Sequence, residues 1–204
     1  MNKERRDGMG ESGIKRRYRQ IKCMLRGGIF ILICYHFRSP ECKQMIEEDI
    51  LAYSRKSLTK LSMLELISED SKRPFRNILY YRFCRDNCNR KMLRICQTCL
   101  KPLPTIEIGG EIDGGLKIIH NYCVVSVKKA GKNLTVLQGV TIGKNIDGGH
   151  PTIGDNVTVY SNSVIFGDIN IGNGVMIGAG AVVNKSIPDN MAAVGNPVKI
   201  MPKK

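Results

Sequence analysis

Aliphatic residues recur at every sixth position through the second half of the chain. They are Ile106, Ile112, Ile118, Val124, Ala130, Val136 and Ile142 and, after a slip, Ile153, Val159, Ile165, Ile171, Ile177 and Val183. A second row, four residues further on, is small or aliphatic almost throughout: Leu116, Leu134, Val140, Ile146, Val157, Ser163, Ile169, Val175, Ala181 and Ile187. Glycine, Asp and Asn fill the turns between. This period predicts short strands, three to a coil, with coils stacked about 4.8 Å apart by parallel pairing.

The slip in this period lies between Ile142 and Ile153. One hexapeptide plus five residues separates the two, and the extra residues fall around Asp147-Gly148-Gly149-His150-Pro151-Thr152. An insertion in a stack of coils has to leave the stack as a loop, and such loops often carry function. We therefore expect a functional loop here.

The first half of the chain shows helical spacing instead. Apolar residues predict helices over residues 45–68 and, after Pro74, over Phe75–Leu100, which Pro102 and Pro104 terminate. We expect the arginines of the second stretch mainly on the solvent side: Arg76, Arg82, Arg85, Arg90 and Arg94. The chain thus divides into 1–44, a basic arm with a short apolar segment; 45–104, an α-helical region; and 105–204, the repeats.

The net charge of +14 is concentrated in the helical half, which holds 23 of the 32 Lys and Arg residues but 5 of the 21 glycines. A basic surface can bind nucleic acid or an anionic membrane face. A solvated helical surface explains the charge as well, and no motif that reads RNA or DNA accompanies it. We expect no nucleic-acid partner and keep peripheral membrane contact as a hypothesis. The longest apolar run, Ile29–Tyr35, is far shorter than the ~20 residues of a spanning helix, so we expect a cytoplasmic protein.

Seven of the eight cysteines precede residue 100. Cys84, Cys88, Cys96 and Cys99 have some likeness to a four-ligand zinc set. However, three residues separate the first pair, within a helical stretch, and the loop between the pairs is short. Reduced thiols on helix faces explain the four cysteines equally well, and we predict no metal site.

The repeats resemble the left-handed β-helix acyltransferases, and more narrowly serine acetyltransferase and its relatives encoded with bacterial surface-polysaccharide genes. The resemblance covers residues 105–202, and a weaker likeness begins near Met45. It rests on Leu137-Gln138-Gly139-Val140-Thr141-Ile142-Gly143, the loop from Gly148 to Asp155, Ile177-Gly178-Ala179-Gly180-Ala181-Val182-Val183, Ile187-Pro188 and Val194-Gly195-Asn196-Pro197. It implies an α-helical region followed by a left-handed parallel β-helix of hexapeptide repeats. The left hand comes from the resemblance alone, because parallel crossovers generally favour the opposite hand.

The resemblance also implies direct transfer of acetyl from acetyl-CoA to an acceptor hydroxyl. A base must remove the hydroxyl proton during attack on the thioester, and histidine suits this because its ordinary pKa lies near neutral pH. Of three histidines, His120 matches the family's catalytic base, and His150, next to Gly149, matches its second active-site histidine at the acceptor. From spacing alone, His120 is a surface residue on a coil edge, and His150 is a loop residue bonded to its own Gly-Gly turn.

The family is trimeric and holds CoA in a groove between neighbouring prisms, so we expect a homotrimer with the active site at a subunit interface. Small residues would let the pantetheine arm approach the backbone, and Lys185 resembles a lysine that meets CoA phosphates in related sugar acetyltransferases. An ordinary exposed lysine is an equal alternative. The small candidates are Gly139, Ser161, Gly178 and Ala179. Cys123 has no visible partner base, and we expect it to be structural.

Departures from the family pattern leave the acceptor open. Serine acetyltransferases carry an Asp before the base and an Arg before the loop histidine, where this chain has Ile119 and Gly149. The Asp that orients the base corresponds to Thr105, for which Glu107 or Asp113 are candidate substitutes. Loss of a carboxylate-binding Arg is not conservative. Three functions remain: serine O-acetylation in cysteine biosynthesis, sugar O-acetylation in capsule or exopolysaccharide biosynthesis, and a non-catalytic trimeric scaffold, against which the two histidines argue.

Overall fold

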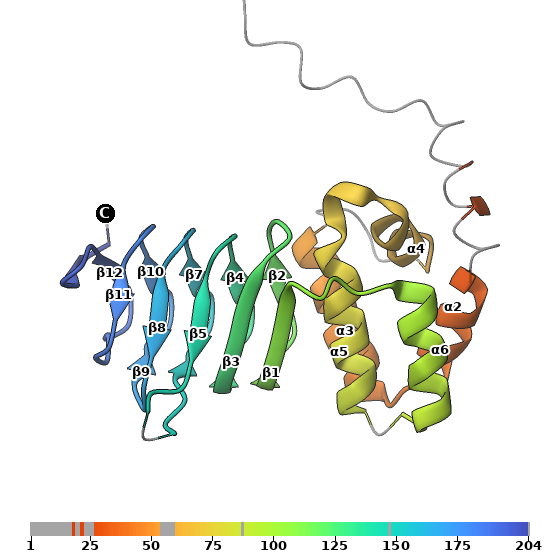
Figure 1. Cartoon of the computed structure of the whole chain (residues 1–204), viewed down its shortest axis with the longest axis horizontal. Helices are drawn as coiled ribbons and strands as arrows, with labels where there is room; N and C mark the ends of the chain where they lie inside the picture. The colour runs from red at the N-terminus through yellow and green to blue at the C-terminus, as the bar shows by residue number, and fades with distance from the viewer. Residues whose placement is uncertain are drawn as a thin grey trace, which may run out of the picture.

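The computed structural model describes residues 18, 21–22, 27–53, 60–86, 88–146 and 148–203. A group of helices adjoins one end of a parallel β-solenoid (Figure 1). The fold is an α-helical region followed by a left-handed β-helix, as the sequence predicted. Among the described helices, none has both the length and the apolar character needed to cross a membrane.

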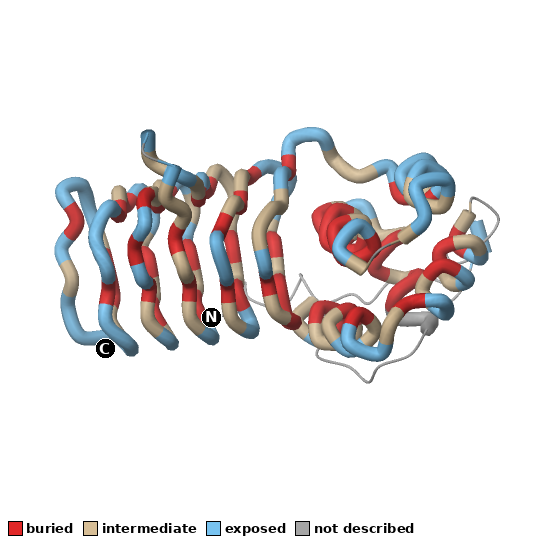
Figure 2. The backbone as a smooth tube through the Cα atoms, turned by 90° about the horizontal axis from the view of Figure 1, so that it is seen from below, coloured by how far each residue is buried: buried red, intermediate tan, exposed pale blue. Residues whose placement is uncertain are grey.

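The helical part packs around its own apolar core, which includes Ile46, Phe75, Leu79 and Phe83. Buried residues, drawn in red, recur along these helices (Figure 2). Its elements are α2 (Ile29–His36), α3 (Pro40–Tyr53), α4 (Lys60–Ser68), the 3-10 turn η2 (Asp70–Lys72), α5 (Pro74–Arg85) and α6 (Arg90–Leu100). Part of the helical stretch predicted over 45–68, residues 54–59, lies outside the described residues.

The stretch predicted as one helix over Phe75–Leu100 is two helices. Asp86 follows α5 and accepts hydrogen bonds from the Ser39 hydroxyl at 2.6 Å and the Ser39 backbone N–H at 3.1 Å. Asn89 then begins α6 by accepting a hydrogen bond from the Lys91 N–H at 2.8 Å. Asn is a favoured residue at this capping position, so a local capping signal marks the start of a new helix. The spacing of apolar residues did not reveal this signal.

The solenoid has three faces of parallel strands. The first holds β1 (Ile106–Ile112), the start of β3 (Cys123–Ala130), β5 (Thr141–Gly143), β8 (Val164–Phe166) and β11 (Val182–Val183). The second holds the end of β3, β6 (Thr152–Ile153) and β9 (Asn170–Ile171). The third holds β2 (Lys117–Ile118), β4 (Thr135–Val136), β7 (Thr158–Val159), β10 (Met176–Ile177) and β12 (Met191–Val194). β13 (Lys199–Pro202) pairs antiparallel with β12 and closes the far end.

The strand register confirms that equivalent aliphatic residues stack between coils. Val136 is opposite Ile118 on one side and Val159 on the other, and all three are buried. Two positions depart from the predicted rows. Val125, not Val124, is buried, because Val125 is the partner of Ile142 in β5, and the chain takes one residue more than the period predicts between Ile118 and this position. Ile146 is fully exposed, because it lies in the inserted loop.

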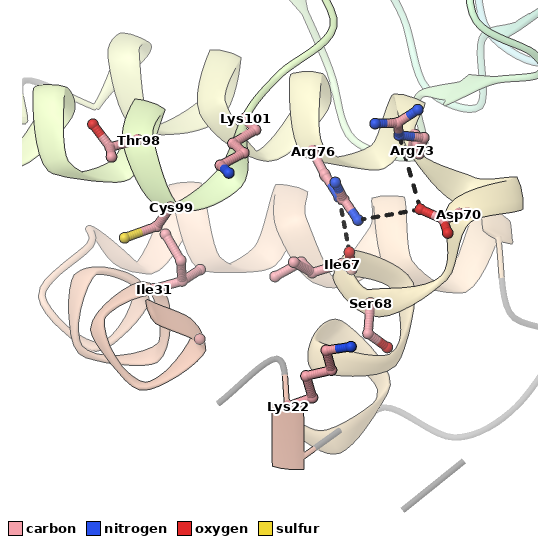
Figure 3. A pocket seen from close by; sticks show the side chains of 11 residues that line it. Lys22, Ile31, Ile67, Ser68, Asp70, Arg73, Arg76, Thr98, Cys99 and Lys101 are labelled. Atoms are coloured by element: carbon pink, nitrogen blue, oxygen red, sulfur yellow. Dashed lines mark hydrogen bonds and ion pairs between the residues drawn. The ribbon is translucent and has the colours of Figure 1, made fainter. Parts of the chain in front are cut away.

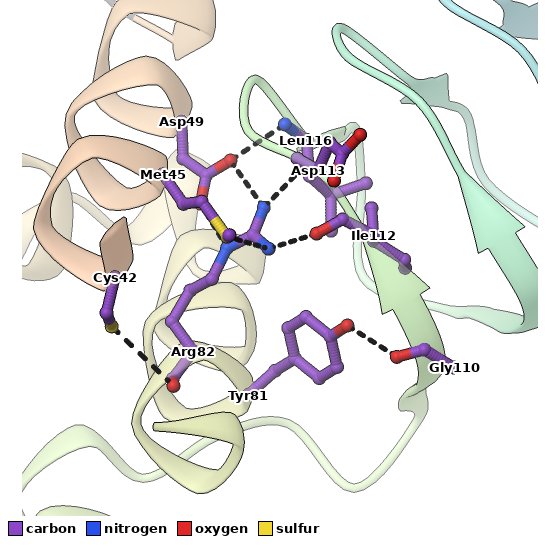
Figure 4. A network of polar contacts seen from close by, with 9 residues as sticks. All are labelled: Cys42, Met45, Asp49, Tyr81, Arg82, Gly110, Ile112, Asp113 and Leu116. Atoms are coloured by element: carbon purple, nitrogen blue, oxygen red, sulfur yellow. Dashed lines mark hydrogen bonds and ion pairs between the residues drawn. The ribbon is translucent and has the colours of Figure 1, made fainter. Parts of the chain in front are cut away.

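The helices cover the open end of the solenoid with polar side chains that bond to its backbone. The first coil has no preceding coil to pair with, and buried N–H and C=O groups need partners. The Asn77 amide donates to the carbonyl of Leu103 at 2.8 Å, and its oxygen accepts from the Leu103 N–H at 2.8 Å. The Tyr81 hydroxyl donates to the carbonyl of Gly110 at 2.7 Å (Figure 4).

Arg82 is at the centre of this junction, so its predicted place on the solvent side was wrong. Its side chain is 3% exposed and forms a bidentate pair, at 2.9 and 3.0 Å, with Asp49, which is 0% exposed (Figure 4). Arg82 also donates to the carbonyls of Ile112 and Asp113, and Asp49 accepts from the Leu116 N–H at 2.8 Å. The Arg82–Asp49 ion pair therefore supplies the hydrogen-bond partners that the backbone of a preceding coil would have supplied.

Candidate active site

His120 lies at the corner where the third face turns into the first, directly after β2. It is exposed, and its backbone has φ of 71°, which is uncommon for a residue other than glycine. The Ile119 N–H donates to the Val136 carbonyl at 2.8 Å, so the strand is paired up to the corner. Within the described chain, the His120 imidazole has no hydrogen-bond partner. The ring is thus presented to solvent on a fixed backbone turn.

The carboxylate that would orient this histidine in the family has no equivalent among the described contacts. Thr105, at the matching position, donates its hydroxyl to the Asn121 carbonyl and therefore supports the turn after His120. Glu107 is an exposed residue of β1 opposite Val124. Asp113 follows β1 at a different corner, where its N–H bonds to the Ala130 carbonyl at 3.0 Å. Neither carboxylate is seen to bond to His120.

The corner of His120 continues down the solenoid as a column of equivalent positions. The register of β2, β4, β7 and β10 aligns His120 with Gln138, Ser161 and Ala179. The Asn162 N–H donates to the Gln138 carbonyl, and the Gly180 N–H donates to the Ser161 carbonyl, both at 3.0 Å. The side chains become shorter along this column, from His120 through Gln138 to Ser161 and Ala179. The end of the column far from His120 therefore leaves space next to the backbone.

Gln138 is a residue of this column that sequence reasoning did not single out. Its side-chain oxygen Oε1 is buried and accepts no hydrogen bond from the described part of the protein. Buried acceptors are generally paired, so an unpaired one beside a candidate site is notable. The only available sequence signal was a Gln between Leu137 and Gly139, in a column whose equivalent positions hold His120, Ser161 and Ala179.

The inserted loop leaves the prism between β5 and β6, as predicted, and carries His150. The Asn145 N–H donates to the Gly149 carbonyl at 3.2 Å, and the Gly149 N–H donates to Asn145 Oδ1 at 3.0 Å. The Gly148 N–H donates to the Asn145 carbonyl at 3.1 Å, with φ of 90° at Gly148. Asn145, not His150, closes this turn. The His150 imidazole is half-buried and has no hydrogen bond to another described residue.

Gly149 has no space for a side chain. A Cβ atom built there would lie 2.7 Å from Cβ and 2.8 Å from the backbone nitrogen of Asp168 in the next coil. Real Cβ atoms do not approach backbone this closely, so any other residue would displace the loop. An arginine before the loop histidine therefore cannot be accommodated in this loop conformation.

The two histidines occupy different corners of one prism. His120 precedes β3, whereas His150 packs near the bend of that strand, where the Lys128 N–H donates to the Pro151 carbonyl at 2.9 Å. About five extended residues lie between the two corners, and at ~3.3 Å per residue this separates them by about 17 Å. A single chain does not bring the two imidazoles together.

The predicted CoA-contacting residues divide between the same two corners. Four of them lie at or beside the corner of His120: Gly139, Ser161, Gly178 and Ala179. Lys185 is exposed after β11, on the side from which the loop with His150 emerges. Both groups could contact one ligand only if corners of neighbouring copies meet.

The cysteines have structural surroundings. Burial raises the pKa of the Cys123 thiol to about 12, which disfavours a thiolate and agrees with the structural role expected for it. Among the four cysteines considered for zinc, Cys84 is exposed, whereas Cys96 is buried with its sulfur 3.4 Å from that of Cys34. In the described ranges, no three His, Cys, Asp or Glu side chains are grouped as a metal site would require.

A cavity of about 780 Å³ lies in the helical part, and all of its lining residues precede the solenoid (Figure 3). Its floor includes Ile31 and Ile67, and Asp70 contributes one carboxylate. Four cationic residues line it: Lys22, Arg73, Arg76 and Lys101. No residue predicted from the sequence as part of a site lines this basic cavity.

The fold and the two histidine corners define the class of this molecule: a hexapeptide-repeat left-handed β-helix with candidate acyltransferase residues on its rim. Residues 150–185, which begin at His150, match the family model described as bacterial transferase hexapeptide (six repeats).

Particular relatives narrow this class. Serine acetyltransferase 1, chloroplastic, of Arabidopsis thaliana is 40% identical over 101 residues, which are 47% of this chain and 32% of that protein. The chain thus spans about a third of that relative. The structure of Neisseria gonorrhoeae serine acetyltransferase in complex with serine has a TM-score of 0.53 and 25% identity, covering 78% of this chain and 69% of that one.

Serine acetyltransferase of Brucella abortus strain S19, solved in complex with coenzyme A, shares the fold with a TM-score of 0.54 at 22% identity, covering 81% of this chain and 70% of that one. Together, the matches confirm that this chain is similar to the serine acetyltransferase-like hexapeptide-repeat acyltransferases.

Proposed function

We propose that the protein is an acetyl-CoA-dependent O-acetyltransferase of the serine acetyltransferase type. The observation that carries this proposal is the exposed His120 at the head of a corner column that narrows to Ser161 and Ala179. Similar chains have been solved with CoA and with serine, which supports acetyl-CoA as the donor and a hydroxyl compound as the acceptor.

His120 acts as the general base in this proposal. It removes the acceptor's hydroxyl proton while the oxygen attacks the carbonyl carbon of the thioester, a role worth roughly 10²–10⁴-fold in rate. Backbone N–H groups stabilise the resulting oxyanion. As the intermediate collapses, the C–S bond breaks, and the leaving CoA sulfur takes the proton from the imidazolium. Cys123 is no acyl carrier here, because its buried thiol resists ionisation.

The separation of the histidines in one chain leads us to propose a homotrimer as the active form. In it, the corner of His120 from one copy faces the loop corner of the next, which brings His150 and Lys185 to the same groove. Exposed apolar side chains at both corners support this arrangement: Tyr122 is 59% exposed beside His120, and Ile146 is 100% exposed in the loop. Such side chains gain from burial between subunits.

The acceptor assay tests the proposal directly. Purified protein is mixed with acetyl-CoA and either L-serine or a panel of sugars, and released CoA thiol is measured. Thiol release that depends on the acceptor supports transfer, and release with serine supports the serine enzyme. If the protein did not bind acetyl-CoA at all, the non-catalytic trimeric scaffold would be the function that remains.

A sugar hydroxyl is the second candidate acceptor, and Gly149 favours it. Close packing of Gly149 on Asp168 leaves no position for an arginine that would bind the carboxylate of serine. A neutral sugar, such as a precursor of a capsule or exopolysaccharide, needs no such cation. Release of thiol with sugars but not with serine would support this candidate.

We also propose a cytoplasmic location and peripheral contact between the basic helical part and anionic lipid. The cationic residues around the basic cavity support the contact, and all seven described cysteines are free, as in a reducing compartment. We expect salt-sensitive binding to phosphatidylglycerol vesicles and none to phosphatidylcholine vesicles. Replacing Arg73 and Lys101 by Glu should abolish it, whereas the same change at Arg90 and Lys91 on α6 should matter less. Equal losses in both variants would exclude the cavity as the contact.

A further inference from the structure

The strand that leads to His120 has one edge without a neighbouring strand. β2 is the first strand of its face, and its N–H groups at Lys117 and Ile119 bond toward the next coil, at 2.9 and 2.8 Å. Side chains and backbone groups alternate along a strand, so the N–H and C=O of Ile118 face the helices instead. Those two groups lie two residues before His120.

Tyr53, the last residue of α3, supplies partners for both of these groups. Its hydroxyl accepts from the Ile118 N–H at 2.9 Å and donates to the Ile118 carbonyl at 2.6 Å. The ring packs edge-on against Phe75, with centroids 5.6 Å apart, and the Lys117 ammonium lies 6.0 Å from its centroid. Burial raises the pKa of this hydroxyl, so it remains protonated and able to donate at neutral pH.

We infer that Tyr53 is a positioning residue for His120, a role that rests on the proposed acetyl transfer. His120 has a left-handed backbone conformation that residues with a side chain rarely adopt, so the chain on either side of it must be held. Thr105 holds the following residue, Asn121, and Tyr53 holds Ile118 in front. The helical part thereby fixes the direction in which the His120 imidazole points from the corner.

Tyr81 provides a comparison, because its hydroxyl also donates to a backbone carbonyl at the same end of the solenoid, although it makes one hydrogen bond to the backbone where Tyr53 makes two. It donates to the Gly110 carbonyl in β1, a strand that does not lead to His120. Tyr53→Phe and Tyr81→Phe each remove one buried hydroxyl from the junction. If both residues had a purely structural role, each variant would lose stability, and neither would lose kcat selectively.

The kinetic experiment compares the two variants with the wild type, with acetyl-CoA varied up to saturation at a fixed, saturating concentration of the acceptor. We expect Tyr53→Phe to lower kcat about tenfold, within the range that misplacement of a catalytic group produces, with little change in the KM for acetyl-CoA. Tyr81→Phe should retain kcat within about twofold of the wild type, since it leaves the base in place. Equal losses of kcat in the two variants, or none in either, would overturn the inference.

A second readout does not need activity. The chain has three histidines, so the ring C–H resonances can be assigned by NMR with His120→Ala as reference. Tyr53→Phe should shift or broaden the His120 resonance and leave that of His150 unchanged, whereas Tyr81→Phe should change neither. An unmoved His120 resonance in Tyr53→Phe would overturn the inference.

In the wild type, the Ile118 amide should exchange slowly with solvent. Exchange at the rate of exposed loop amides would show that the bond to Tyr53 is absent and would overturn the inference even if Tyr53→Phe failed to fold. Absence of acetyl transfer by the wild type, with these NMR results as expected, would instead count against the proposed function alone.

Discussion

Replacing Arg82 by Met tests the junction between the helices and the solenoid. The methionine side chain fills much of the arginine's volume but removes the guanidinium. Asp49, which is 0% exposed, would then keep a buried carboxylate with no cation beside it. The carbonyls of Ile112 and Asp113 would lose their donors at the same time.

The expected loss of stability follows from these contacts. Removing one partner of a buried ion pair costs about 3–5 kcal/mol, because the remaining charge is left unpaired in a medium that solvates it poorly. For a protein of this size, each kcal/mol lowers Tm by roughly 2–4 °C, so the melting temperature should fall on the order of 10 °C. The full effect requires the Asp49 carboxyl to be ionised.

Denaturation in urea and thermal melts measure this loss, with Arg85→Met as the control. Arg85 is in the same turn of α5, but its pair with Glu111 is exposed, at 3.6 Å, and should contribute less than about 1 kcal/mol. Burial raises the pKa of Asp49, and loss of Arg82 raises it further. Protonation removes the unpaired charge, so the loss caused by Arg82→Met should shrink as pH falls.

The replacement Asp49→Leu with Arg82→Met should recover only part of the loss. It removes both charges but still leaves the Leu116 N–H and the two carbonyls without partners. If Arg82→Met were no less stable than Arg85→Met, the junction would not hold the two parts of the chain together as described.

Three further changes test the site. His120→Ala should lower acetyl transfer by about 10²–10⁴-fold while sedimentation shows an unchanged oligomer, and near-normal turnover would remove it as the base. Gly149→Ala should lower turnover, because the new Cβ would meet Asp168 and displace the loop. Gly143→Ala should leave turnover unchanged, because its Cβ would meet nothing within 4 Å. Equal activity of the two variants would argue against the packing of Gly149 on Asp168. Cys123 should resist alkylation at pH 8 until the protein is unfolded, as followed by mass spectrometry, because burial raises its pKa to about 12; rapid labelling of the folded protein would contradict that burial.

Much of the β-helix could be predicted because its signal is repeated and local. Each coil meets the same demand for an inward aliphatic residue and a corner that tolerates a tight turn, so the pattern recurs wherever the chain comes around. The insertion between Ile142 and Ile153 stood out for the same reason. The two histidines of the candidate site could be named from motifs, but neither could be placed relative to the other.

The errors have a common physical cause. Arg82 has helical spacing like its neighbours, and nothing in its local sequence reports that Asp49, 33 residues earlier, lies against it. Val124 and Val125 are equally apolar, and only the pairing of β3 with β5, in which Val125 lies opposite Ile142, shows which of the two is buried. Tyr53 and Gln138 likewise acquire their roles from strands that approach them in space.

The sequence by itself thus determined the period, the turns and the inserted loop, because these depend on each residue's own conformational preference and on which side chains water excludes. Only the tertiary structure decided how the first coil is closed, which side chains of the helices its backbone binds, and that His120 and His150 occupy separate corners. Such features depend on the pairing of groups distant in sequence, and a buried polar group can be identified only when the surface that covers it is known.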